Sequence, residues 1–166
     1  MTVSNTAYLK GFHDTIKAAG AKVISSDFTF EIEGYESSYL LAKQCPWPVL
    51  SPAGEIEVPT VLGSAMWQPQ QLKPNQQGQV TFEETTAGSI DQMLIDLILS
   101  GGIFNAKIYE GTPEKYLRYK RITDCFLVLD NPDRDWENRA QILLFSGTMF
   151  FHFHGEIVQG TSTDYR

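Results

Sequence analysis

Ser89-Ile-Asp-Gln-Met-Leu-Ile-Asp-Leu-Ile-Leu-Ser-Gly101 is the clearest helical stretch of this sequence. Ser89 and Gln92 have the spacing of a capping box, in which each side chain satisfies the backbone amide of the other residue. Gly101 favours a helix end, so we predict a helix over about residues 89–100. Five apolar residues recur at the spacing of one helix face: Ile90, Met93, Leu94, Leu97 and Ile98.

Most of the remaining sequence has the patterns of strands, which are the available partners for this helix. Residues 27–34 and 103–110 alternate between apolar and polar. Residues 116–129 predict one long strand with a bulge between Tyr119 and Ile122, where the apolar parity changes. The predicted fold is therefore mainly β (α+β), an antiparallel β-sandwich or barrel with one flanking helix. Further strands are expected at 38–45, at 79–84, and at 140–145 and 148–159 as a pair around Gly147.

The N-terminal segment, residues 1–26, predicts a second helix. Asn5 or Thr6 can cap a helix over about 7–19, which Gly20 would end. The sequence shows no internal repeat and no linker, so its 166 residues are expected to form a single domain. The β-rich part of this domain would cover residues 27–158.

Residues 46–84 are the most unusual part of the chain. Six of the eight prolines lie there, which excludes one central strand, and six glutamines fall between Gln68 and Gln79. Residues 55–58 and 61–67 still favour extended structure. We therefore predict a long projecting β-arm with a polar, glycine-containing tip near residues 74–78. Such an arm exposes unpaired backbone groups, so it makes sense if another subunit pairs with it.

The net charge of −7 is concentrated in one part of the chain. Residues 1–26 carry three lysines and one aspartate (+2), residues 27–96 ten acids and two lysines (−8), and residues 97–166 nine acids and eight bases (−1). An acidic surface repels nucleic acid unless a partner supplies cations, although it also serves solubility. No apolar run is long enough to span a membrane, and residues 1–20 lack a signal-peptide core. Synthesis in a cytoplasm is expected, with Cys45 and Cys125 reduced.

No catalytic constellation is apparent, so the protein is not expected to be an enzyme. His152, His154 and Glu156 would share one strand face and could bind zinc or iron. A plain polar strand face explains the same pattern. One basic cluster lacks the aromatic stacking residues of nucleic-acid sites, so either salt bridges to a neighbouring copy or an exposed strand face explains it better. Its members are Lys115, Arg118, Lys120 and Arg121.

Several stretches resemble, in order, the tail tube proteins of contractile-tailed bacteriophages, which are related to the tube protein of type VI secretion. They are Glu55-Ile-Glu-Val-Pro-Thr60, the Pro/Gln arm, Gly78-Gln-Val-Thr-Phe-Glu-Glu84 and the helix that follows. The later strands through Ile157 fit the same order, whereas the N-terminal helix has no counterpart. The resemblance implies a structural virion protein of the tail, built as hexameric rings stacked into a tube, without a cofactor.

The resemblance also implies partners and candidate site residues. The arm would pair with neighbouring subunits and help line the bore, through which DNA passes without specific binding because like charges prevent counterion release. Sheath and baseplate proteins would be further partners, and a membrane would not. A baseplate or tail-terminator adaptor, and a small β-barrel metal-binding enzyme using the two histidines and Glu156, stay open as alternatives. The candidate lumen-lining or inter-subunit residues are Glu55, Glu57, Lys73, Glu83 and Glu84.

Overall fold

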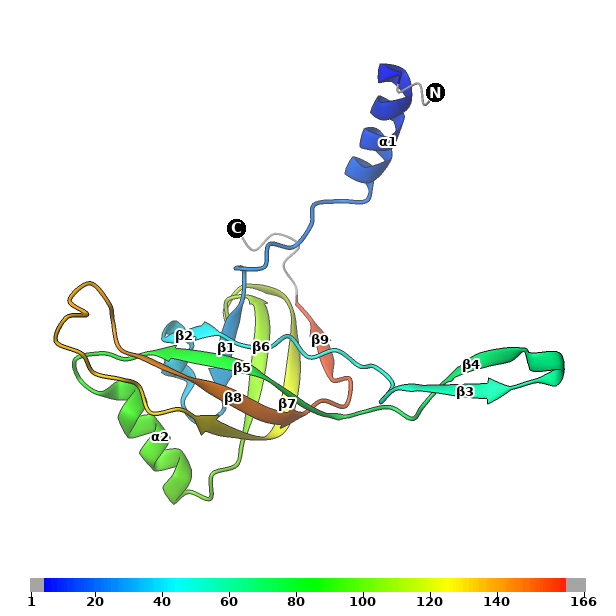
Figure 1. Cartoon of the computed structure of the whole chain (residues 1–166). Helices are drawn as coiled ribbons and strands as arrows, with labels where there is room; N and C mark the ends of the chain where they lie inside the picture. The colour runs from blue at the N-terminus through cyan, green and yellow to red at the C-terminus, as the bar shows by residue number, and fades with distance from the viewer. Residues whose placement is uncertain (1–4, 161–166) are drawn as a thin grey trace.

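A computed structural model of the chain describes residues 5–160. Within this range the chain forms two α-helices, α1 (Thr6–Ala18) and α2 (Ser89–Leu99), and two short 3-10 helices, Glu36–Leu40 and Val61–Gly63. The strands are β1 (Thr29–Ile32), β2 (Ala42–Gln44), β3 (Glu55–Pro59), β4 (Ala65–Pro69), β5 (Asn75–Glu83), β6 (Phe104–Gly111), β7 (Tyr116–Leu129), β8 (Leu144–His152) and β9 (Ile157–Gln159). The predicted mainly β class, with a flanking helix, an N-terminal helix and a projecting arm, is confirmed (Figure 1).

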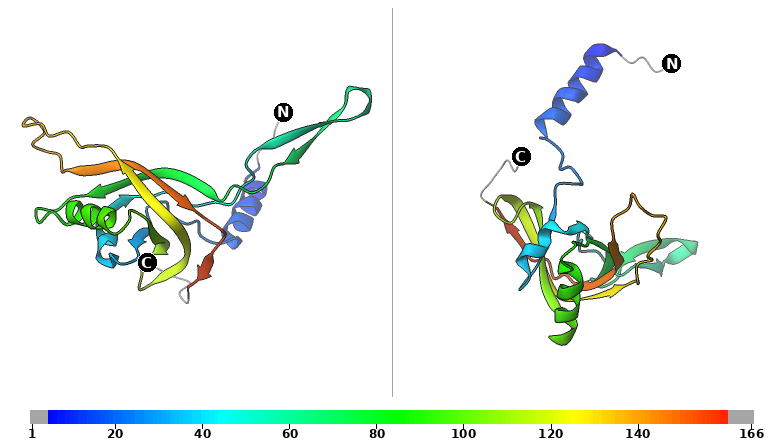
Figure 2. Two further views of the ribbon diagram at one scale, coloured as in Figure 1. Left: turned by 90° about the horizontal axis from the view of Figure 1, so that it is seen from below. Right: turned by 90° about the vertical axis from the view of Figure 1, so that its left-hand side faces the viewer.

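Seven of these strands form one antiparallel sheet that curls around the core (Figure 2). The order of the path is β1-β6-β7-β8-β5-β2, and β9 pairs with β7 off this path. The first half of β7 pairs with β6 and β9, whereas its second half pairs with β8. This long strand therefore joins the two layers of the sandwich. The hairpin β3–β4 lies outside the sheet.

The core lies between the two layers and under α2. Alternate residues of each strand enter it, as the period of two in a β-strand requires. Burial of a large apolar side chain contributes about 1.5–3 kcal/mol, so this cluster supplies most of the subunit's stability. Its largest fully buried side chains include Phe30, Ile32, Phe82, Ile90, Ile108, Ile122, Met149, Phe151 and Phe153.

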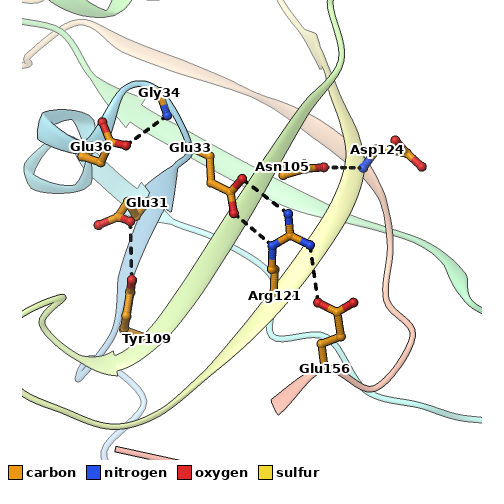
Figure 3. Close-up of polar contacts among 9 residues, drawn as sticks. All are labelled: Glu31, Glu33, Gly34, Glu36, Asn105, Tyr109, Arg121, Asp124 and Glu156. Atoms are coloured by element: carbon orange, nitrogen blue, oxygen red, sulfur yellow. Dashed lines mark hydrogen bonds and ion pairs between the residues drawn. The ribbon is translucent and has the colours of Figure 1, made fainter. Parts of the chain in front are cut away.

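The bulge in β7 exists, but not where the sequence pattern placed it. Between Thr123 and Phe126, β7 has one more residue than the facing stretch of β8, and the pairing with β6 shifts at the same place. Asp124 adopts a left-handed conformation there, with φ of 48°, and its amide donates to Asn105 Oδ1 at 3.2 Å (Figure 3). The prediction of a bulge between Tyr119 and Ile122 was wrong. The aromatic and basic residues before Ile122 are half-buried on both faces of β7, so the change of apolar parity there does not mark an inserted residue.

The expected pair of strands around Gly147 is also wrong. Residues Leu144–His152 form one uninterrupted strand, β8, and only Ile157–Gln159 forms a separate strand after it. Gly147 is present because β7 approaches closely, not because the chain turns. A Cβ atom there would lie 2.2 Å from the carbonyl oxygen of Val128. Near the other end of the chain, residues 38–45 form a 3-10 turn before the short strand β2 instead of one strand.

The start of α2 differs from the predicted capping box. Gly88 is the N-cap residue, in a left-handed conformation, and Gln92 donates to Asp96 Oδ1. The carboxylate of Glu84 accepts hydrogen bonds from the amides of Ile90 and Asp91 instead, at 3.0 and 2.9 Å. A carboxylate at this place also interacts favourably with the helix dipole. The helix itself begins where predicted, but Ile98 points to solvent rather than into the core.

Candidate assembly surfaces

The hairpin β3–β4 projects well beyond the rest of the molecule (Figure 1). Five residue pairs join the two strands, from Glu55 opposite Pro69 to Pro59 opposite Ala65. Behind them the two chains run together to the body, held by the Pro52–Leu72 bridge. At the base, Gln76 Nε2 donates to the Val49 carbonyl at 2.7 Å.

The tip of this arm is not the predicted one. The chain reverses at Val61–Gly63, where Leu62 adopts a left-handed φ of 59° and is fully exposed. Residues 75–78, expected at the tip, belong to β5 and pair with β8 in the main sheet. The glutamines caused this error. A strand of mostly polar residues lacks the alternation of apolar and polar residues that would distinguish it from a loop in the sequence. The β-arm itself is confirmed.

The arm has almost no support from its own subunit. Its apolar side chains are exposed, Trp67 to 70% and Val61 to 81%. A lone two-stranded hairpin is marginally stable in water, and a cluster of exposed apolar groups marks an interaction site. The outer edges of both strands keep backbone groups that could pair with another chain, and within these strands only Pro59 and Pro69 lack an amide donor.

The register of the hairpin separates its side chains into two faces. Glu55, Glu57 and Trp67 lie on one face, because opposite residues in an antiparallel pair share a side. Ile56, Val58 and Met66 lie on the other face. The arm therefore has an acidic face with one indole, and an apolar face.

The other candidate carboxylates lie far from this arm. Glu83 ends β5, and eight residues of extended strand, about 26 Å, separate it from the start of β5 beside the arm. Glu84 follows it and caps α2, so it has a role within the subunit. Lys73 lies at the base of the arm, where its amide donates to the Ser51 carbonyl at 3.1 Å. Within one subunit, the four glutamates thus form two groups.

The basic cluster is largely engaged inside the subunit. Arg118 Nε lies 2.9 Å from Glu110 Oε2. Arg121 bridges Glu33 at 3.0 Å and Glu156 at 3.5 Å (Figure 3). The hydrogen bond from Arg121 lowers the pKa of Glu33. The structure thus gives both arginines partners that the sequence reasoning sought in a neighbouring copy.

The two lysines of the cluster lie in different places. Lys120 Nζ donates to the Pro48 carbonyl at 2.6 Å and lies over the Trp47 ring, and burial lowers its pKa. Lys115 lies in the turn between β6 and β7, where its amide donates to Thr112. Lys120 therefore ties the chain entering the arm to β7.

The predicted alternative metal site is not assembled. His152 ends β8, His154 lies in the following loop, and Glu156 pairs with Arg121. Among residues 5–160, no group of three His, Cys, Asp or Glu side chains could hold a metal ion. Cys45 and Cys125 are free thiols, as expected, and burial raises the pKa of each to about 12. Over the same range, no helix is long and apolar enough to cross a membrane.

The sequence patterns did not predict the buried pair of Glu31 and Tyr109, nor that helix α1 has no buried residue. The alternation in residues 27–34 places Glu31 on the polar side of its strand, but the side chain is buried and accepts from the Tyr109 hydroxyl at 3.4 Å (Figure 3). Helix α1 begins and ends almost as predicted, with Asn5 Oδ1 accepting from the Tyr8 amide. None of its residues is buried, so its apolar stripe packs on nothing in this subunit. Leu9, Phe12 and Ile16 have the spacing of one helix face in the sequence, but the sequence does not show that this face lacks a partner.

Solved structures with a similar fold come from contractile injection systems. The tube-terminating cap of the anti-feeding prophage matches at 13% identity with a TM-score of 0.55, over 85% of this chain and 93% of the cap protein. The sheath–tube complex of the extracellular injection system PVC in its extended state matches at 14% identity and TM-score 0.50, over 96% and 100%. The baseplate of the anti-feeding prophage matches at 13% and 0.50, over 86% and 99%.

These matches establish a shared fold and nothing further, because their sequence identities are too low. No protein-family model and no curated protein matches the sequence. The chain therefore has the fold of tail-tube-related components of contractile injection systems.

Proposed function

We propose that this chain is a structural, non-enzymatic subunit of the tube of a contractile tail, assembled as hexameric rings that stack on one another. The arm β3–β4 is the observation that carries the proposal. It presents an apolar face and two open strand edges that its own subunit does not cover. A neighbouring subunit that pairs with it satisfies both, because main-chain pairing occupies the edge and side-chain contact removes the apolar face from water.

The acidic face of the arm supports a role in the bore. If the apolar face packs on the neighbour, Glu55 and Glu57 on the opposite face are directed away from that contact. In a ring, that direction is the channel. Carboxylates there keep DNA from binding as it passes, since no phosphate-neutralising cations are offered. Glu83 and Glu84 lie at the far end of β5, so they contribute to the channel only if the body also lines it.

The main alternative is a cap, terminator or baseplate adaptor of the same fold. It is favoured by the match to a tube-terminating cap and a baseplate among proteins of this fold. Both roles place the protein in the tail of a virion or tail-like particle, next to sheath and baseplate proteins. They differ in assembly, because a tube subunit polymerises and an adaptor stops at a single ring. Negative-stain microscopy of the purified protein separates hollow filaments from single rings.

Two exposed side chains provide a matched test of the arm. Met66 lies on the apolar face of the arm, exposed to 56%, and Trp136 lies in the loop between β7 and β8, exposed to 95%. We expect Met66→Ala to weaken assembly by about tenfold to a hundredfold, as loss of a buried interface side chain does, without changing the melting temperature of the subunit. Trp136→Ala is expected to leave both unchanged.

Removal of the arm gives a stricter test. Gln70 already pairs with Gly54, its amide donating to the Gly54 carbonyl at 2.9 Å, so an Asn-Gly turn can replace residues 55–69. The shortened chain is expected to fold, because the replaced residues contribute nothing to the core, and to form neither rings nor tubes. Normal tubes from this variant would refute the role of the arm.

A further inference from the structure

Helix α1 is an amphipathic helix without a surface to bind. Its apolar stripe consists of Tyr8, Leu9, Phe12 and Ile16, all exposed by about half or more. Tyr8 and Phe12 pack edge-to-face at 4.8 Å, but only on each other. An isolated helix of 13 residues is marginal in water, so its stability calls for a docking partner.

Helix α2 also leaves apolar side chains without a partner. Ile90, Met93 and Leu97 face the core, whereas Ile98 and Leu99 are exposed to 70% and 80%. Large apolar side chains exposed side by side mark an interaction site. Beside the exposed residues lies a hollow of about 180 Å³, lined largely by apolar side chains that include Leu94, Ile98, Leu127 and Leu129.

The two helices lie at opposite ends of the molecule. In both figures α1 stands off one side of the β-body, on the tether formed by residues 19–28, and α2 lies along the other side (Figures 1 and 2). Their charges are also opposite. Residues 1–26 sum to +2, from three lysines and one aspartate, whereas α2 carries Asp91 and Asp96 and no base.

We propose that α1 of one copy docks on the outer face of α2 in the next copy along the stack. The contact is heterologous, so each copy gives one helix and receives another, and repetition propagates along an axis. It covers both bare apolar stripes at once and brings the basic segment to an acidic helix. The proposal rests on the proposed function only for the head-to-tail order of the copies.

Cross-linking between full-length chains tests the contact. One variant carries Phe12→Cys on α1, a second carries Ile98→Cys on α2, and the two are mixed and treated with a short bismaleimide. The native thiols are poor targets, because Cys125 is buried, Cys45 is partly buried, and burial raises the pKa of each to about 12. The unmodified chain measures their background. A cross-linked dimer is expected from the mixture. A Trp136→Cys partner, whose cysteine lies outside α2 at a position even more exposed than Ile98, is expected to give at least tenfold less.

Exchange of charges between the two helices provides the second part of the test. Lys10→Glu with Lys17→Glu on the first chain is expected to lower the dimer yield severalfold, and Asp91→Lys with Asp96→Lys on its partner to restore it. Equal yields with the Trp136→Cys control overturn the proposal. So does a cross-link within a single chain carrying both Phe12→Cys and Ile98→Cys at high dilution. Binding of α1 to anionic phosphatidylserine vesicles without the dimer would identify a lipid surface and also overturn it.

Microscopy of the same samples separates this inference from the proposed function. Tubes or rings without the α1–α2 cross-link would refute the helix contact and leave the arm's role standing. A cross-link from chains that form neither rings nor tubes would refute the proposed assembly and leave the helix contact standing.

Discussion

Removal of the Glu84 carboxylate is expected to destabilise the subunit through the start of α2. This carboxylate accepts from the amides of Thr85, Ile90 and Asp91 at 2.8, 3.0 and 2.9 Å. A lost N-terminal cap costs about 0.5–2 kcal/mol, and the lost charge at the helix dipole adds about 0.3–1 kcal/mol. We therefore expect Glu84→Ala to lower the free energy of unfolding by about 2 kcal/mol. In a chain of this size that corresponds to a melting temperature lower by about 4–8 °C.

The pH dependence of this effect has a definite sign. Burial on its own raises the pKa of Glu84, but the hydrogen bonds from the three amides outweigh it, and the pKa lies below its ordinary value. A carboxyl with a lowered pKa in the folded state contributes its stability above the pKa of the unfolded chain, about 4.3. That contribution is lost as the pH falls through the folded pKa. The advantage of the parent chain over Glu84→Gln is thus expected at pH 7 and absent near pH 2.

Urea unfolding followed by circular dichroism measures both effects. Glu83→Ala is the matched control, because it removes the adjacent carboxylate and leaves the amides of α2 capped. The control is expected to stay within about 0.5 kcal/mol of the parent chain, as surface substitutions do. Equal stability of the parent chain and Glu84→Ala at pH 7, or an equal loss in Glu83→Ala, would refute the capping role.

Three further substitutions test the body of the fold. Gly147→Ala places a Cβ 2.2 Å from the Val128 carbonyl oxygen and is expected to lower the free energy of unfolding by at least about 2 kcal/mol, measured in urea. Ile122→Ala empties a fully buried site beside the bulge, and a loss of about 2–5 kcal/mol is expected in the same assay. Arg121→Met removes ion pairs that are partly exposed, so the loss is expected to stay below about 1 kcal/mol and to shrink further in 1 M salt, checked by thermal melting with and without salt.

The parts of the fold that sequence could predict are those governed by local chemistry. Asn5 caps α1 and the apolar spacing of α2 marks a helix, and each lies where the pattern indicated. The errors arose where distant chain segments decide the structure. Gly147 has the sequence of a turn, and only the approach of β7 shows why a glycine is needed in the middle of a strand. Ser89 has the sequence of a cap, but Glu84 outcompetes it because a carboxylate binds the amides more strongly than a hydroxyl.

The candidate site was predictable in kind but not in detail. Prolines and glutamines indicated an arm, because neither suits a central strand. The position of its tip depends on which residues β8 pairs with, and pairing partners cannot be read from one strand alone. The basic cluster shows the same limit, since the fold brings Glu110 to Arg118 from β6 and Glu33 to Arg121 from the end of β1, and the local sequence does not show either pairing.

The distribution of buried apolar groups separates the stability of the subunit from that of the assembly. The sheet and α2 contain the whole core, whereas α1 contributes no buried residue and β3–β4 none either. Ordering the backbone of these two segments costs about 1–2 kcal/mol per residue in conformational entropy, and the subunit offers little burial to offset it. In the proposed assembly, contacts between copies supply this offset. The stability of the subunit then rests on the sheet and α2, and its free energy of association rests on the arm and α1.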